Sequence, residues 1–269
     1  MRPARVARSP GVPSWSDPGP RRLPRELKVF AALLAASLVA WAITYRRMRG
    51  MDMGPGTELG GLAWYVGVWI VMMAAMMLPS VAPAAVAYSS FAERRALAGR
   101  RPVPTLVFVG GYLVAWTFFG LMAYAVYRLA AGTAPRLLAW DRGGRYVAAG
   151  ALVCAGIYEL APLKQACLRR CRGPIAVVGR WRDGPAGALG MGIRHGLDCV
   201  GCCFGLMLAL FALGVMSVAW MAIVGAAVAA EKLLPRGRRV ALGVGAAVIV
   251  AGVWVAASPS SFPGLTIPG

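Results

Sequence analysis

The chain alternates between long uninterrupted apolar blocks and short polar connections from about residue 29 to residue 257. Most blocks come close to the roughly 20 residues needed to cross a hydrocarbon core of about 30 Å. Within lipid, a lone segment satisfies all of its backbone N–H and C=O groups only as a helix. The pattern therefore predicts an all-α, polytopic transmembrane helical bundle. The candidate spans are 29–45, 62–90, 104–129, 146–163, 198–214, 216–231 and 240–257.

The block from Cys199 to Ala230 sets the number of spans, because its 32 residues carry no charge. It is either one long tilted helix or a hairpin that breaks near Gly214. With the N-terminus inside, a hairpin gives seven spans, with 22 Lys and Arg residues inside and 7 outside. A single helix gives six spans, with 18 Lys and Arg residues inside and 11 outside. The positive-inside rule favours the hairpin. We therefore expect about seven spans, with six as the alternative, in the cell's inner (plasma) membrane with the N-terminus in the cytoplasm.

The two ends of the chain differ from its apolar middle. Residues 1–27 are rich in Arg, Pro and Gly without apolar periodicity, which predicts a disordered basic cytoplasmic arm. Residues 28–257 form the predicted transmembrane domain. Residues 258–269 contain no charge, and the seven-span topology makes them a short external tail.

Composition agrees with a membrane protein, since 59% of the residues are hydrophobic and 14% are charged, against about 25% charged in soluble domains. The net charge of +19 would suggest nucleic acid in a soluble protein. Here the basic residues lie in the connections and form no basic helix face. We expect the lipid bilayer as a partner and no nucleic acid. No G-x-S-x-G, Walker A or H-E-x-x-H motif indicates a catalytic class.

The strongest chemical signal is a run of soft ligand types at the start of the fifth predicted span. On a helix, side chains three or four residues apart share one face. This spacing aligns His195, Cys199, Cys202, Cys203 and Met207. Thiolate, imidazole and thioether suit Cu(I), Zn(II) or an iron–sulfur species. Packing of small residues between helices is the alternative interpretation.

A second pair of thiols, Cys167 and Cys171, lies in the basic connection before that span. The two would be one helical turn apart, on the cytoplasmic side, where a permanent disulfide is disfavoured. Both cysteine groups could converge on one site. A basic loop with incidental cysteines is the alternative.

Methionine forms two i, i+4 pairs in the second predicted span, Met72 with Met76 and Met73 with Met77. Thioethers bind Cu(I), so we add Met72 and Met76 to the candidate ligands as part of a path toward the cysteines. Methionine is also ordinary gap-filling core material, and packing is the alternative.

Three carboxylates fall close to membrane depth, where ionisable groups are functional candidates. For Glu231 we expect an interfacial ion pair with its neighbour Lys232. Glu159 and Asp198 neighbour the cysteine groups, and one of them could support His195.

Five stretches together make a more specific pattern: Trp69–Pro83, Gly156–Pro174, Gly192–Met207, Trp220–Met221 and Glu231–Lys232. Over residues 60–235 this pattern resembles a bacterial family of predicted metal-binding integral membrane proteins of unknown function. The resemblance implies metal binding, in some cases copper handling.

We therefore expect a membrane protein that binds a metal ion, with copper first and zinc or iron as alternatives. His195, Cys199, Cys202 and Cys203 are the primary predicted ligands, and Cys167, Cys171, Met207, Met72 and Met76 are the further ones. Its role would be as a chaperone, transporter or sensor, with a protein partner for metal delivery. The rival functions are a thiol–disulfide oxidoreductase that uses Cys199 and Cys202 as a C-x-x-C pair, and a structural membrane subunit.

Overall fold

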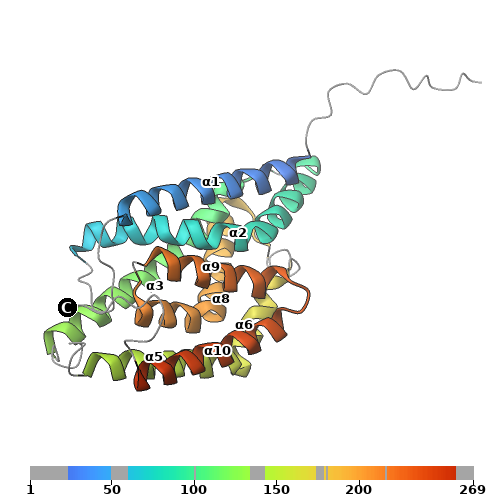
Figure 1. The fold of residues 1–269 in the computed structure, drawn as a ribbon. Helices are drawn as coiled ribbons and strands as arrows, with labels where there is room; N and C mark the ends of the chain where they lie inside the picture. Colours follow the sequence, from blue (N-terminus) through green and yellow to red (C-terminus); the bar gives the residue numbers. More distant parts are fainter. Residues whose placement is uncertain are drawn as a thin grey trace, which may run out of the picture.

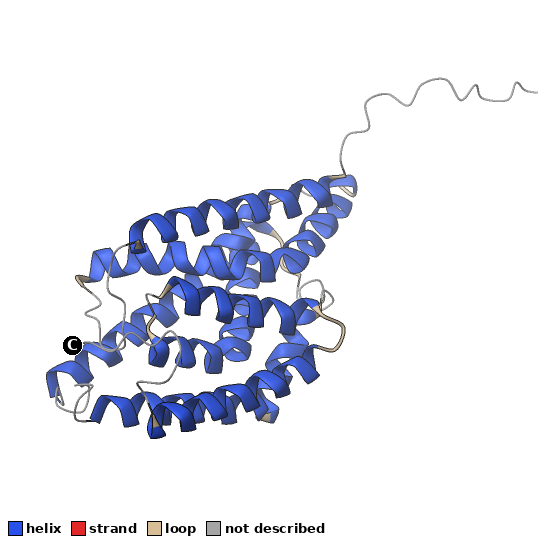
Figure 2. Cartoon of the chain, in the orientation of Figure 1, coloured by secondary structure: helices blue, strands red, loops and turns tan. Residues whose placement is uncertain are grey.

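The computed structural model describes residues 24–49, 60–99, 101–133, 143–173, 179, 181–215 and 217–258. These residues form eight α-helices and no strand (Figures 1 and 2). The all-α bundle is confirmed. Residues 1–23 and 259–269, most of the predicted arm and tail, lie outside the described residues. The helices are α1 (Arg25–Met48), α2 (Leu62–Leu97), α3 (Thr105–Thr133), α5 (Arg145–Leu160), α6 (Pro162–Arg172), α8 (Gly184–Leu213), α9 (Val218–Leu233) and α10 (Gly237–Ala257).

Five of these helices, α1, α2, α3, α8 and α10, are long and apolar enough to cross a membrane. The pair α5 and α6 adds a sixth candidate span, broken by a bend of 62°. The expected seven is therefore a slight overstatement. The difference is α9, whose 16 residues are fewer than the roughly 20 that a span needs. The long apolar helices are compatible with a multi-pass membrane protein.

The predicted break of the uncharged block is present in the structure at Gly214. Helix α8 ends at Leu213, and Gly214 has φ of 108°, a conformation that glycine adopts without the steric penalty of a side chain. Ser217 then caps α9, because its hydroxyl oxygen accepts a hydrogen bond from the Trp220 backbone N–H. The two helices form a hairpin.

Helix α8 begins at Gly184, about 14 residues before the start that hydropathy predicts. Its first half packs backbone to backbone against α3: a Cβ atom on Gly192 would lie 2.0 Å from the Phe108 carbonyl oxygen. Such an approach requires glycine. As a result, the His195–Met207 segment occupies the middle and second half of a 30-residue helix instead of the entrance of a short one.

The two prolines inside α2 are accommodated within one continuous helix. Pro79 has no N–H, so the carbonyl of Ala75 one turn earlier loses its helical partner. The Ser37 hydroxyl of α1 donates a hydrogen bond to that carbonyl oxygen at 2.7 Å. This contact helps to hold α1 along α2, and Figure 1 shows the two helices side by side.

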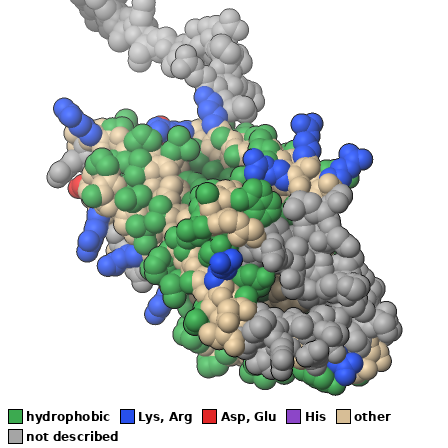
Figure 3. All heavy atoms as spheres, turned by 90° about the vertical axis from the view of Figure 1, so that its left-hand side faces the viewer, with side chains coloured by type: hydrophobic (Ala, Val, Ile, Leu, Met, Phe, Trp, Pro, Cys, Tyr) green, Lys and Arg blue, Asp and Glu red, His purple; other side chains and the backbone are tan. Residues whose placement is uncertain are grey.

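The remaining helices complete the bundle around α8. In Figure 1, α5 and α10 run together on the side of the bundle opposite α1 and α2, with α9 between the two pairs. Seen from the end where α2 begins, hydrophobic side chains cover much of the described surface, and Lys and Arg side chains project around them (Figure 3). This distribution is what short basic connections between apolar helices produce.

Candidate metal centre

Three cysteine thiols from two helices meet inside the bundle. The Sγ atoms of Cys171 on α6 and of Cys199 and Cys202 on α8 all lie within 4.8 Å of one another, and all three residues are buried. The sharp bend between α5 and α6, with Pro162 at the first position of α6, turns α6 back toward α8. Cys171 thereby reaches thiols that lie 28 and 31 residues further along the chain.

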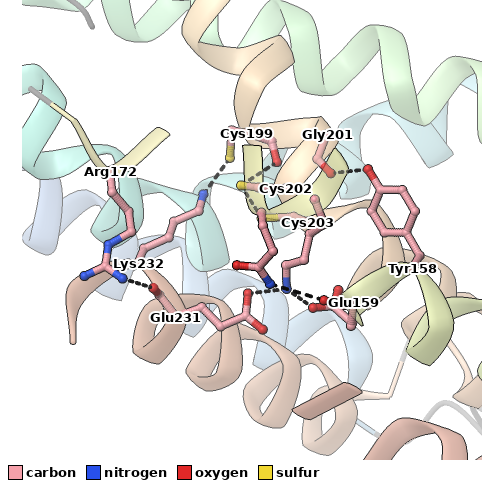
Figure 4. Close-up of polar contacts among 11 residues, drawn as sticks. Tyr158, Glu159, Arg172, Cys199, Gly201, Cys202, Cys203, Glu231 and Lys232 are labelled. Carbon is pink, nitrogen blue, oxygen red and sulfur yellow. Dashed lines mark hydrogen bonds and ion pairs between the residues drawn. The ribbon is translucent and has the colours of Figure 1, made fainter. Parts of the chain in front are cut away.

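A fourth thiol borders this three-thiol site. The Sγ atom of Cys203 lies 3.6 Å from that of Cys202, and Cys203 is also buried. The Cys202 thiol donates a hydrogen bond to the Cys199 carbonyl oxygen at 3.2 Å (Figure 4). Four sulfur atoms are thus available in one buried region.

Two polar side chains from other helices contact Cys199. The Lys232 ammonium nitrogen of α9 lies 2.8 Å from its Sγ atom, and the Tyr112 hydroxyl oxygen of α3 lies 2.9 Å from the same atom. Lys232 also donates to the Ser80 hydroxyl of α2 at 3.4 Å. A cation beside a buried thiol stabilises its thiolate form, which is the form that binds metals. Sequence reasoning did not identify Tyr112, whose sequence neighbourhood carries no motif.

The expected ion pair between Glu231 and Lys232 is not formed. Successive helical residues point in different directions, so Lys232 reaches Cys199 whereas Glu231 faces α6. There the Lys164 ammonium nitrogen lies 2.6 Å from a Glu231 carboxylate oxygen and also pairs with Glu159. All three are buried in the interior of the bundle and do not lie at its surface.

The other predicted ligands lie near this centre but outside the three-thiol group. His195 is buried between the rings of Phe108 and Tyr112, with both centroids 5.9 Å away. Its Nε2 atom has no hydrogen-bond partner among the described residues. Cys167 is partly buried against Gly201, on a different side of α8. Met72, Met76 and Met207 are buried in the same core cluster as the thiols.

The three-thiol site has the chemistry and spacing of a soft-metal site. Thiolates select Cu(I), zinc and iron–sulfur species over hard cations. Sulfur atoms around a metal at about 2.3 Å are separated by about 3.8 to 4.6 Å, depending on the coordination number. The observed limit of 4.8 Å lies close to this range.

Comparison with known proteins agrees with a metal function. A family model named PpoB2 and described as "Copper chaperone" matches residues 66–255. No curated protein and no solved structure matches the chain. The matched range contains every cysteine named above as well as Lys232 and the buried ion pairs.

Proposed function

We propose that this chain, which belongs to the PpoB2 family of copper chaperones, binds Cu(I) as cargo at the thiols of Cys171, Cys199 and Cys202. It then passes the ion to a partner protein. The observation that carries the proposal is the convergence of these three sulfur atoms within 4.8 Å from two helices. Cysteines that only fill space between helices have no need to meet in this way.

The arrangement of the site suits a carrier. Three thiolates around a monovalent cation leave one ligand position open, and open positions are typical of sites that exchange ligands. Cys203 borders the three thiols, with its Sγ atom 3.6 Å from that of Cys202. It can bind transiently as the cargo enters or leaves.

A thiol–disulfide oxidoreductase remains the alternative, with Cys199 and Cys202 as its redox pair. Such an enzyme needs two thiols and no metal. The third thiol, Cys171, and the buried cation Lys232 favour a metal site, because together they supply an additional ligand and a counter-charge. Thiol trapping in intact cells separates the two functions: the chaperone keeps these thiols reduced, and a reversible Cys199–Cys202 disulfide would support the oxidoreductase.

The site is proposed to work from within a bacterial plasma membrane, with the N-terminus in the cytoplasm. The support is the charge distribution, with most Lys and Arg on one side of the candidate spans. A reporter fused to the N-terminus tests this orientation. Activity in the cytoplasm is expected, and activity only outside it would contradict the proposed orientation.

The metal itself is tested by titrating the detergent-purified chain with Cu(I) against a chromophoric chelator. Serine replacement of Cys171, Cys199 or Cys202 should each weaken the tight site at least about 100-fold, and Cys203→Ser should weaken it less. Cys154→Ser is the matched control, because Cys154 is exposed on α5. A triple variant of the three thiols that still binds Cu(I) as tightly as the wild type would refute the proposal.

A further inference from the structure

Two side-chain contacts bracket a stretch of the core on one side of the thiols. At the far end, the Trp69 ring of α2 stacks on the Phe211 ring of α8, with centroids 5.8 Å apart. At the near end, Ser80 of α2 contacts Lys232, which contacts Cys199 of α8. Residues 70–79 of α2 and residues 200–210 of α8 therefore lie between these two landmarks.

The core between the landmarks is rich in thioethers. Four methionines of α2 and one of α8 fall within these residue ranges, and one methionine of α9 joins them. All six are at most 3% exposed and belong to the core cluster that contains the thiols. We define them as the methionine path: Met72, Met73, Met76, Met77, Met207 and Met221.

A chain of polar contacts joins the near end of this path to the three-thiol site. The Met77 sulfur lies 4.0 Å from the Ser80 hydroxyl oxygen, and that oxygen is 3.4 Å from the Lys232 ammonium. On α8, Met207 is one helical turn beyond Cys203, on the same face. Sulfur ligands thus continue from the thiols along α8 into the methionine path.

On the α9 side of the path, Gly225 lets a methionine of α2 pack close to the helix backbone. A Cβ atom on Gly225 would lie 3.6 to 3.8 Å from the Met76 side chain, so Met76 packs directly over the α9 backbone. Met221 lies one turn further from Lys232 along the same helix. Three helices therefore contribute thioethers to one buried core cluster.

We propose that the methionine path is a second, weaker Cu(I)-binding region that loads the three-thiol site. The inference rests on the proposed function. A thioether is a neutral soft ligand for Cu(I), so copper bound by the path keeps its single positive charge, whereas each thiolate of the three-thiol site adds a negative charge. The thiolates, which carry charge, bind Cu(I) more tightly and draw it to the end of the path.

The loading step is a ligand exchange. Bonds from Cu(I) to thioether sulfur break and bonds to thiolate sulfur form, while copper stays monovalent and no electron is transferred. A cysteine that begins as a thiol releases its proton to solvent. No oxidant or reductant is required.

Leucine replacement separates this role from packing. Leu and Met have similar volumes, and buried exchanges between them are well tolerated, so the variant loses sulfur but keeps the core filled. The test variant is Met76→Leu/Met77→Leu/Met207→Leu. The control is Met48→Leu/Met191→Leu, because both of its residues are buried methionines of the same core that lie outside the path.

The probe is Cu(I) itself, added to the detergent-purified full chain. Wild type and control should bind a tight first equivalent and a weaker second one. The triple leucine variant should lose the second equivalent and load the first at least about tenfold more slowly, with its final affinity unchanged. If the triple variant does not fold, Met77→Leu alone should slow loading at least about threefold.

A second equivalent and a loading rate that both survive in the leucine variant would overturn the methionine path. The three-thiol proposal fails differently. In that case the serine variants of Cys171, Cys199 and Cys202 would still bind the first equivalent of Cu(I) tightly, whatever the methionine variants do.

Discussion

Lys232 places its ammonium nitrogen 2.8 Å from the thiol sulfur of Cys199, although the two residues are 33 positions apart on different helices. Both are buried, so the cation and the sulfur face each other in a region of low dielectric where charge is expensive. Cu(I) bound by three thiolates carries a net negative charge. Lys232 supplies the opposite charge inside the bundle at the point where it is needed.

Replacing this cation should weaken copper binding. A hydrogen bond to a charged group contributes about 1.5 to 3 kcal/mol, so we expect Lys232→Met to raise the Kd for Cu(I) by about 10- to 100-fold. Lys232→Arg should recover part of the loss, because it keeps the charge. Lys28→Met, which changes an exposed lysine on α1, is the control. An unchanged Kd in Lys232→Met would show that Lys232 does not balance the site.

The buried ion pairs of Lys164 should support the fold more than the copper site. Lys164→Met removes the cation that pairs with both Glu159 and Glu231 in the interior. Loss of one partner from a buried pair costs about 3 to 5 kcal/mol. We expect that decrease in the free energy of unfolding in detergent, followed by circular dichroism.

A double variant provides the internal control for these pairs. Lys164→Met/Glu231→Gln removes a positive and a negative charge together, so it should be more stable than Lys164→Met alone. The interpretation would be wrong if Lys164→Met were as stable as the wild type.

The packing of α8 on α3 should depend on a single glycine. Gly192→Ala inserts a Cβ atom 2.0 Å from the Phe108 carbonyl oxygen, which forces the helices apart. Overpacking of this kind costs about 1 to 3 kcal/mol. Gly190 lies on the same helix, and a Cβ atom there would meet no atom within 4 Å, so Gly190→Ala should be neutral or stabilising by up to about 1 kcal/mol. Equal changes in the thermal unfolding temperature of Gly192→Ala and Gly190→Ala, measured in detergent, would contradict this packing.

Much of the architecture follows from local features of the sequence. Apolar blocks identify the helices because each block must satisfy its own backbone. The break at Gly214 follows from charge counting and from a residue that tolerates positive φ. The length of α8 was not predictable in the same way, because its first half is defined by packing on α3, and hydropathy does not report which backbones approach closely.

The candidate site was partly predictable. The spacing on α8 put Cys199, Cys202 and Cys203 together, and the structure adds Cys171 but leaves Cys167 outside the three-thiol group. Two cysteines one turn apart were indistinguishable in the sequence. The direction that α6 takes after its bend decides between them, and that direction is a property of the tertiary fold. The contact of Lys232 with Cys199 depends on the same long-range packing.

The most direct test of the three-thiol site is X-ray absorption at the copper edge of the chain loaded with one equivalent of Cu(I). The predicted spectrum has about three sulfur neighbours at about 2.3 Å, a typical metal–thiolate distance. In Cys171→Ser the sulfur count should fall, and in Cys154→Ser it should stay the same. Copper surrounded by nitrogen or oxygen, or a spectrum that Cys171→Ser leaves unchanged, would contradict a copper centre at Cys171, Cys199 and Cys202.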